Sequence, residues 1–446
     1  MKTIITNSII ITMNSDMEVF PDGYVKIEGT KILETGPSCD LKETTEDLRA
    51  AGWQIKDGKR GILMPGMVNT HCHLGMIPFR GLGDDCKDRL RVFLLPMEQK
   101  AMSRRMAALS SRYAICELLL SGVTSVMDMY YFEAAVAQVM DQTGIRGIAG
   151  QTLMDEGGCD ASDADQSLSM AKELIETYRM HPRISGCAAP HATNTCSPQI
   201  LKKAWELDTA NQVPFTLHAA EMDYEMTWLA QTRGCTPVGY LDQLGVLSDQ
   251  TAAAHCIHLT DRDIEILRQR GSGVCHCIGS NAKAAKGVAP VLKLLKEGVS
   301  VGLGTDGPAS GNTLDLFTQM RLCAGFQKND SHDRSAMPAK DIVSMATRQG
   351  ARVLGLEEKT GSIEPGKEAD LVLVETDSPN MFPVYDPYSA LVYSANASNV
   401  KDVYVAGTCL VQDKKLVYED FESIRRELSD CMGRSAFGEM QELHRL

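Results

Sequence analysis

Short apolar segments alternate with amphipathic segments through the middle of the chain. Most of the intervening stretches repeat apolar residues with helical spacing, as in residues 103–122 and 197–212. The apolar segments have the length of buried strands, and they occupy residues 62–71, 123–129, 145–154, 184–191, 213–221, 251–257, 273–279 and 299–307. Eight strands alternating with helices predict an α/β fold, namely a (β/α)₈ TIM-type barrel over residues 63–362.

Both ends of the chain have a different pattern. Residues 1–62 and 363–446 contain short β-rich runs separated by turn residues, such as Pro365-Gly366. Because chain termini often lie close together, we expect the two ends to form one small β-sandwich. The stretch from Asp420 to Leu446 is charged and has a helical pattern, which predicts a terminal helix.

Composition narrows the class of protein. The 446 residues are 43% hydrophobic and 23% charged, which is typical of a globular chain long enough for an enzyme core. The net charge is -13 and no run of Lys and Arg reaches four residues, so we expect no nucleic-acid partner. No apolar run is long enough to span a membrane. The fourteen cysteines accompany no secretory segment, which predicts reduced thiols in a cytoplasmic protein.

Histidines gather where the predicted strands end. Seven of the ten lie at or just past these positions, namely His71, His73, His191, His218, His255, His258 and His276. Catalytic groups of a (β/α)₈ barrel lie at the carboxyl ends of its strands. The distribution therefore predicts an active site at that end of the barrel.

His71 and His73 end the first predicted strand with one residue between them. Side chains two apart on an extended strand point to the same face, so both imidazoles can reach one metal ion. Cys72 points the other way and is expected to pack in the core. The alternative is that both histidines are polar residues of a loop.

Three further strand ends offer groups that fit a catalytic metal site. His218 could be a third nitrogen ligand, and Glu221 a nearby proton carrier, although Glu221 could instead cap the next helix. His255 could be a ligand or an acid–base group. Asp306, in Gly-Thr-Asp-Gly, could bind the metal or accept a proton from its water, or be a turn residue.

Other sequence patterns for catalysis have little support. Residues 302–307 match G-x-G-x-x-G, but they lie late in the alternation and Pro308 follows, unlike the opening of a dinucleotide-binding helix. The chain contains no G-x-S-x-G elbow, no P-loop and no C-x-x-C pair. The sequence therefore contains no recognisable motif for binding a nucleotide.

Taken together, these motifs resemble the amidohydrolase superfamily over nearly the whole chain. The matching residues are Pro65–His73, His218–Glu221, His255 and Gly304–Gly307. Within that superfamily, Ser280–Lys283 and Gly287–Pro290 resemble the methylthioadenosine/S-adenosylhomocysteine deaminases and the related chlorohydrolases.

The resemblance implies a role for each matching residue. One divalent metal ion, Zn²⁺ or alternatively Fe²⁺, would be held by four ligands, His71, His73, His218 and Asp306. Glu221 would carry a proton to the ring nitrogen, and His255 would orient the attacking water and stabilise developing charge.

The resemblance also points to a small heterocyclic substrate. Glu98 and His191 match positions that contact the ribose in adenosine-type deaminases. This implies a metal-dependent deaminase that releases ammonia from an adenine-type nucleoside such as 5′-methylthioadenosine. The acidic loop over residues 152–165 lacks the arginines that bind the homocysteine carboxylate in the family, and residues 84–96 lack its tryptophan, which makes S-adenosylhomocysteine a weaker substrate hypothesis.

Two alternatives stay open. The chain could deaminate or dechlorinate another N-heterocycle, such as a pterin, a guanine-like base or a triazine. It could also be a non-catalytic binding protein, although it retains every expected ligand and both proton-transfer residues. A homo-oligomer is compatible with either alternative.

Overall fold

Eight parallel strands run through the middle of the chain in the structure, a computed structural model that describes residues 2–437. They form two four-stranded sheets, in the orders β6-β7-β8-β9 and β10-β11-β12-β13. The first sheet contains β6 (Met67–Cys72), β7 (Val123–Tyr130), β8 (Arg146–Leu153) and β9 (Ile184–Pro190). The second contains β10 (Phe215–Ala219), β11 (Thr251–His255), β12 (Gly273–His276) and β13 (Val301–Leu303). The predicted α/β fold with parallel strands is confirmed.

Backbone hydrogen bonds connect the two sheets at both edges. On one side, the amide of His218 donates to the carbonyl of His191 at 3.0 Å. On the other, the amide of Asp306 donates to the carbonyl of His71 at 3.1 Å. The carboxyl ends of strands from both sheets are therefore brought together.

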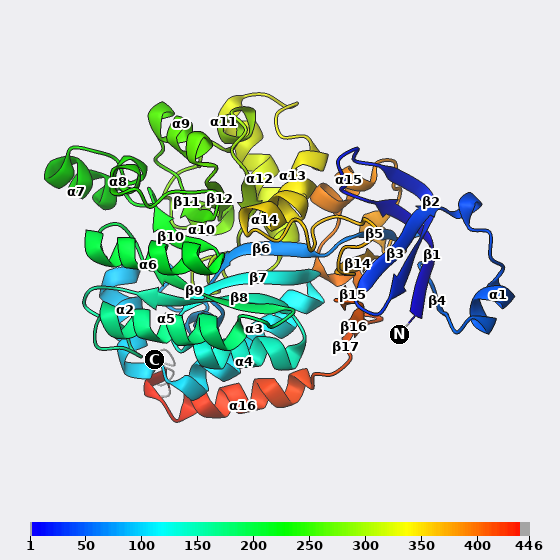
Figure 1. The fold of residues 1–446 in the computed structure, drawn as a ribbon, viewed down its shortest axis with the longest axis horizontal. Coiled ribbons are helices and arrows are strands. Elements are labelled where there is room, and N and C mark those ends of the chain that lie inside the picture. The colour runs from blue at the N-terminus through cyan, green and yellow to red at the C-terminus, as the bar shows by residue number, and fades with distance from the viewer. Residues whose placement is uncertain (1, 438–446) are drawn as a thin grey trace.

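Helices cover the outside of these sheets (Figure 1). The longer ones are α3 (Arg104–Leu120), α4 (Glu133–Thr143), α5 (Ala164–Tyr178), α6 (Pro198–Asn211), α7 (Asp223–Arg233), α8 (Pro237–Leu244), α9 (Asp261–Arg270), α12 (Leu316–Ser331), α13 (Ala339–Ala346) and α16 (Phe421–Gly433). Short helices are α1 (Thr45–Ala50), α2 (Leu95–Ala101), α10 (Ile278–Lys283), α11 (Val291–Lys296), α14 (Arg348–Val353) and α15 (Pro387–Ser389).

Helix α9 illustrates how the sequence sets these boundaries. Thr260 and Asp263 form a reciprocal capping box at its start, which satisfies amide groups that have no partner within the helix. Gly271, in the left-handed conformation with a φ of 74°, ends it. Between them, Ile264 and Leu267 bury one face of the helix in the core.

The two ends of the chain share one nine-stranded sheet. Its order is β17-β16-β15-β14-β5-β1-β2-β3, and β4 pairs with β1. The strands are β1 (Lys2–Ile11), β2 (Val19–Glu28), β3 (Lys31–Pro37), β4 (Gln54–Asp57), β5 (Ile62–Pro65), β14 (Leu371–Val374), β15 (Val400–Val405), β16 (Thr408–Gln412) and β17 (Lys415–Leu416). The two ends therefore meet, whereas the predicted arrangement as a β-sandwich stays a prediction.

The segment over residues 62–71 differs from the expected single strand. It is divided at Gly66 into β5, which pairs with β1 and β14, and β6, which pairs with β7. A Cβ atom at Gly66 would lie 2.0 Å from the Thr124 hydroxyl oxygen, so a side chain does not fit there. The prediction of one continuous strand is wrong because β5 takes its partners from distant parts of the chain.

A buried ion pair connects the central strands to the end sheet. Arg146, at the start of β8, donates to both carboxylate oxygens of Asp370 at 2.7 and 3.1 Å. Asp370 also accepts a hydrogen bond from the amide of Ala406 at 2.7 Å.

Near the C-terminus, helix α16 packs against helix α3 (Figure 1). Helix α16 lies within the range of the predicted terminal helix, and residues 438–446 of that prediction lie outside the described part.

The cysteine side chains and the lengths of the helices are two further features of the described residues. All fourteen cysteines fall within the described residues, and each is a free thiol. Across residues 2–437, no helix is long and apolar enough to cross a membrane.

Candidate active site

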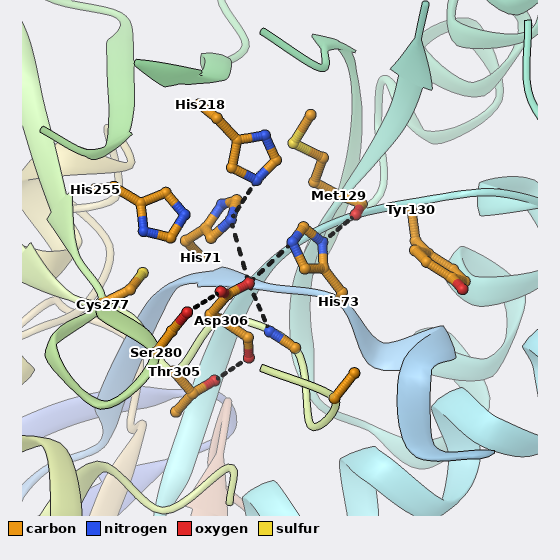
Figure 2. A network of polar contacts seen from close by, with 12 residues as sticks. His71, His73, Met129, Tyr130, His218, His255, Cys277, Ser280, Thr305 and Asp306 are labelled. Atoms are coloured by element: carbon orange, nitrogen blue, oxygen red, sulfur yellow. Dashed lines mark hydrogen bonds and ion pairs between the residues drawn. The ribbon is translucent and has the colours of Figure 1, made fainter. Parts of the chain in front are cut away.

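Three histidines converge at the carboxyl ends of β6 and β10 (Figure 2). His71 and His73 come from the end of β6 and His218 from β10. The Nε2 atoms of His71 and His218 are 3.1 Å apart, and the ring centroids of His71 and His73 are 4.8 Å apart. All three side chains are buried. The predicted common direction of His71 and His73 is therefore what the structure shows, and Cys72 is buried in the core.

Asp306 completes this cluster from the loop after β13. Its Oδ1 atom lies 3.0 Å from Nε2 of His73 and 3.9 Å from Nε2 of His71. Figure 2 shows this carboxylate directly beneath the imidazoles. Ser280 donates to its other oxygen at 2.6 Å, and the amide of Gly307 donates to Oδ1 at 2.8 Å. Asp306 is thus held by several donors and does not act as an isolated turn residue.

These donors fit a divalent metal ion. Ligand atoms of His71, His73 and His218 lie within 4.8 Å of one another, as do those of a second group, His71, His255 and Asp306. Imidazole nitrogens with one carboxylate oxygen are a donor set that zinc prefers in catalytic sites. The site therefore has the composition and spacing of a metal centre.

Contacts behind the imidazoles orient them. Nδ1 of His73 is 2.5 Å from the carbonyl of Met129, and Nδ1 of His218 is 2.7 Å from the carbonyl of His191. A carbonyl accepts a proton, so in each ring Nδ1 carries the hydrogen and Nε2 faces the cluster. Such contacts fix the tautomer that a metal ligand requires.

Burial and neighbouring charges together determine which groups of the cluster are protonated. Burial lowers the pKa of His71 and His218 well below the usual value, and the neighbouring histidines act in the same direction. Burial would also lower the pKa of His73, but Asp306 raises it to about 9. Burial would raise the pKa of Asp306, but its hydrogen bond and charge interaction with His73 hold it well below the usual value. The cluster thus combines neutral imidazoles at His71 and His218 with an ion pair between His73 and the ionised carboxylate of Asp306.

Glu221 and His255 lie beside the cluster. Oε1 of Glu221 is 3.5 Å from Nε2 of His255, and Nδ1 of His255 is 2.9 Å from Oδ1 of Asn281. Burial would raise the pKa of Glu221, but His255 and Lys286 lower it well below its usual value. Glu221 is therefore an ionised carboxylate that can accept a proton. The alternative that it caps α7 is wrong, because that helix has Met222 at its N-cap and no side-chain cap.

A cavity of about 440 Å³ opens onto these groups. His191 and Glu98 line it together with His73, Glu221 and Asp306. The structure thus brings both predicted substrate residues to the same cavity as the cluster.

Glu98, on α2, is only 2% exposed and accepts a hydrogen bond from the Tyr130 hydroxyl at 2.6 Å. Burial raises the pKa of Glu98 to about 7, although this hydrogen bond acts against the shift. Burial lowers the pKa of His191 to about 4, and its Nδ1 is 3.0 Å from the Thr195 hydroxyl.

Two of the histidines at strand ends lie away from the cavity. Both ring nitrogens of buried His276 are without a hydrogen-bond partner among the described residues, and burial lowers its pKa to about 3. His258 pairs with Asp223 at 3.4 Å near the surface. Neither side chain lines the cavity, so strand-end position alone is an incomplete guide.

Sequence reasoning missed two residues of the site. Tyr130 ends β7 and bonds to Glu98, and its strand-end position was an available signal. Lys286 contacts Glu221 at 2.5 Å, yet it falls between the motifs Ser280–Lys283 and Gly287–Pro290 and nothing in the sequence marks it. Lys283 instead pairs with Asp84 at 2.8 Å at the cavity rim.

The parallel-strand scaffold, the His/Asp cluster and the adjacent Glu221–His255 pair have the composition expected of a metal-dependent hydrolase site. Residues 62–410 match the model of the amidohydrolase family. The chain belongs to the amidohydrolase family, as the resemblance in its motifs implied. The prediction of a hydrolase that acts on C–N bonds is thereby confirmed.

Named relatives cover nearly the whole chain. A 5-methylthioadenosine/S-adenosylhomocysteine deaminase of Thermodesulfovibrio yellowstonii is 38% identical over 93% of this chain and 94% of its own length. A 5'-deoxyadenosine deaminase of Methanosphaera stadtmanae is 35% identical over 92% of this chain and 95% of its own length. The crystal structure of an adenosine deaminase from Xanthomonas campestris with bound zinc is similar with a TM-score of 0.92 and 30% identity, covering 97% of this chain and 98% of that one.

Proposed function

We propose that this chain is a hydrolytic deaminase of adenine-type nucleosides with a modified 5′ position. The observation that carries the proposal is the shared cavity, in which Glu98 and His191 face the same space as Glu221 and the His/Asp cluster. A buried carboxylate is suited to accept hydrogen bonds from sugar hydroxyls. The printed names of the relatives, which include deaminases of 5-methylthioadenosine and 5'-deoxyadenosine, support the same substrate class.

The metal ion in this proposal is Zn²⁺, with Fe²⁺ as the alternative, held by His71, His73, His218 and Asp306. The zinc bound to the structural relative from Xanthomonas campestris supports this choice. When bound, such an ion acts as a Lewis acid and lowers the pKa of a coordinated water to about 7. Elemental analysis of the purified protein would distinguish zinc from iron.

Proton transfer in the proposed reaction depends on Glu221 and His255. Water adds to the amine-bearing ring carbon, and Glu221 accepts the proton that the water loses. Glu221 then donates this proton to the neighbouring ring nitrogen, so that negative charge does not accumulate there. His255, whose Nε2 is 3.5 Å from Oε1 of Glu221, orients the adding oxygen and stabilises the charge that develops on it. Transfer of the second water proton to the amine releases ammonia and leaves the oxo product.

The test is a panel of substrates for ammonia release by the zinc-loaded protein. We expect turnover of 5′-methylthioadenosine and 5′-deoxyadenosine, and weaker turnover of S-adenosylhomocysteine. If activity is confined to pterins, guanine or triazines, the proposed substrate class is wrong. Activity on no compound of the panel would favour the alternative of a non-catalytic binding protein.

The Glu221→Gln variant provides the matched control for this panel. It is expected to retain the metal and to lose turnover by about 10²-fold or more, because the proton carrier is removed. Loss of the metal, or activity near wild type, would contradict the role of Glu221.

The proposal for the scaffold is a closed barrel over residues 63–362, with a β-sandwich formed by residues 1–62 and 363–446. Backbone hydrogen bonds at both edges of the two four-stranded sheets support the closed barrel. The shared sheet of the two ends supports the second unit. An experimental structure in which β9 and β10 are separated would contradict the barrel.

A further inference from the structure

Lys286 lies in the cavity and contacts the proposed proton carrier. It follows helix α10, and its Nζ atom is 2.5 Å from Oε1 of Glu221. The two side chains are 16% and 15% exposed, so the pair is largely removed from water. Ion pairs in such surroundings are stronger than pairs at the surface.

The short segment that carries Lys286 supports three residues of the site. Ser280 donates to Asp306 at 2.6 Å, and Asn281 contacts Nδ1 of His255 at 2.9 Å. Lys286 makes the third of these contacts, with Glu221. One segment after β12 thus contacts Asp306 of the proposed metal site, the imidazole of His255 and the proposed proton carrier, Glu221.

The charges around Glu221 explain why a cation is needed at this point. The negative charge of Asp306 acts against ionisation of Glu221, and the carboxyl group of Glu225, whose pKa burial raises to about 7, accepts the Glu221 amide at 3.1 Å. Both carboxyl groups disfavour a third negative charge nearby. Lys286 provides a compensating charge on the cavity side.

We propose that Lys286 is a positioning residue, which holds the Glu221 carboxylate in the orientation required for proton transfer. The inference rests on the proposed function, because it concerns the residue that carries the proton there. Oε1 of Glu221 lies between Lys286 and His255, at 2.5 and 3.5 Å, so the carboxylate is restrained from both sides. Loss of Lys286 leaves Glu221 free to turn away from the cluster.

The kinetic test compares Lys286→Met with the conservative Lys286→Arg. Misplacement of a catalytic group by about 1 Å costs on the order of 10²-fold in rate. We expect Lys286→Met to lower kcat by about 10- to 100-fold with little change in KM, and Lys286→Arg to recover most of the loss. Lys293→Met removes a lysine paired with Asp261 at the surface and is expected to retain wild-type kinetics.

The role through Glu221 is tested in a second background. In a Glu221→Gln protein, Lys286→Met should change the residual kcat by less than about twofold, because the group it positions is already removed. Equal losses in both backgrounds, a change in KM alone, or no rescue by arginine would overturn the proposal. These measurements use whichever heterocycle of the panel the wild-type protein converts, so an incorrect substrate class does not affect them.

A crystal structure of zinc-loaded Lys286→Met provides a test that needs no turnover. We expect the Glu221 carboxylate to move away from Nε2 of His255 while the metal ligands keep their positions. An unmoved Glu221 would overturn the positioning role even for a protein without activity on the panel. Absence of turnover with a displaced Glu221 would instead contradict only the proposed function.

Discussion

Glu98 offers a sharp test of how the cavity binds a nucleoside. Its carboxyl group is buried, and burial raises its pKa to about 7. If this group accepts hydrogen bonds from the two ribose hydroxyls, only the ionised form binds well. Affinity should therefore be highest above pH 7 and should weaken about tenfold for each pH unit below it.

The magnitude of the effect follows from the charge of the acceptor. A hydrogen bond to a charged group contributes about 1.5–3 kcal/mol, which corresponds to about 10- to 150-fold in affinity. We expect a 3′-deoxy analogue of 5′-methylthioadenosine to bind more weakly than the parent by this factor. In Glu98→Gln the acceptor is neutral, so the discrimination should fall below about tenfold and the pH dependence should disappear.

The assay is calorimetric titration of zinc-loaded protein that also carries Glu221→Gln, which separates binding from turnover. Glu176→Gln, an exposed glutamate on α5, is the matched control and should leave both the discrimination and the pH dependence unchanged. Undiminished discrimination against the 3′-deoxy analogue in Glu98→Gln would refute the assignment of Glu98 to the ribose.

Two further predictions concern stability. Arg146→Met leaves Asp370 buried without its partner, and chemical denaturation should show a loss of about 3–5 kcal/mol, much of which Arg146→Met/Asp370→Leu should recover; an unchanged midpoint would contradict this. In metal-free protein the folded pKa of His73 is about 9, above its ordinary 6.5, so its stabilisation is complete below pH 6.5 and is lost as pH rises through 9. The free energy of unfolding of chelator-treated protein should therefore fall between pH 6 and pH 10 by about 3 kcal/mol, and a flat profile would count against the His73–Asp306 pair.

The eight strands were predictable because their signals are local. Each is a short apolar run next to a helical pattern, and all eight appear in the structure in the expected order. The exception at Gly66 arises from pairing with β1 and β14, strands whose proximity no local pattern encodes. The central scaffold therefore follows from periodicity, whereas the boundary with the end sheet depends on distant contacts.

The residues of the candidate site were likewise predictable only in part. His71 and His73 share one strand end, so their spacing alone predicted a common direction. Lys286 reaches Glu221 across 65 positions, and a lysine in a loop resembles any solvated surface residue in sequence. Position at a strand end identifies groups that can meet, but the residues that hold them come from loops whose paths are set by tertiary packing.

Backbone conformation at the strand ends explains why these particular side chains meet. Ala220, His255 and Asp306 follow or end β10, β11 and β13 with φ values of 51°, 68° and 58°, a left-handed region that non-glycine residues adopt at a cost. The turn ends the extended path at the point where the parallel strands would otherwise continue in register. Asp and His tolerate this conformation better than most residues do, which joins two requirements, ligand chemistry and an abrupt turn, in the same residue types. Because surrounding hydrogen bonds, such as the Asp306 amide to the His71 carbonyl, retain this geometry, its strain is offset by the fold and the cluster is held ready before any ligand binds.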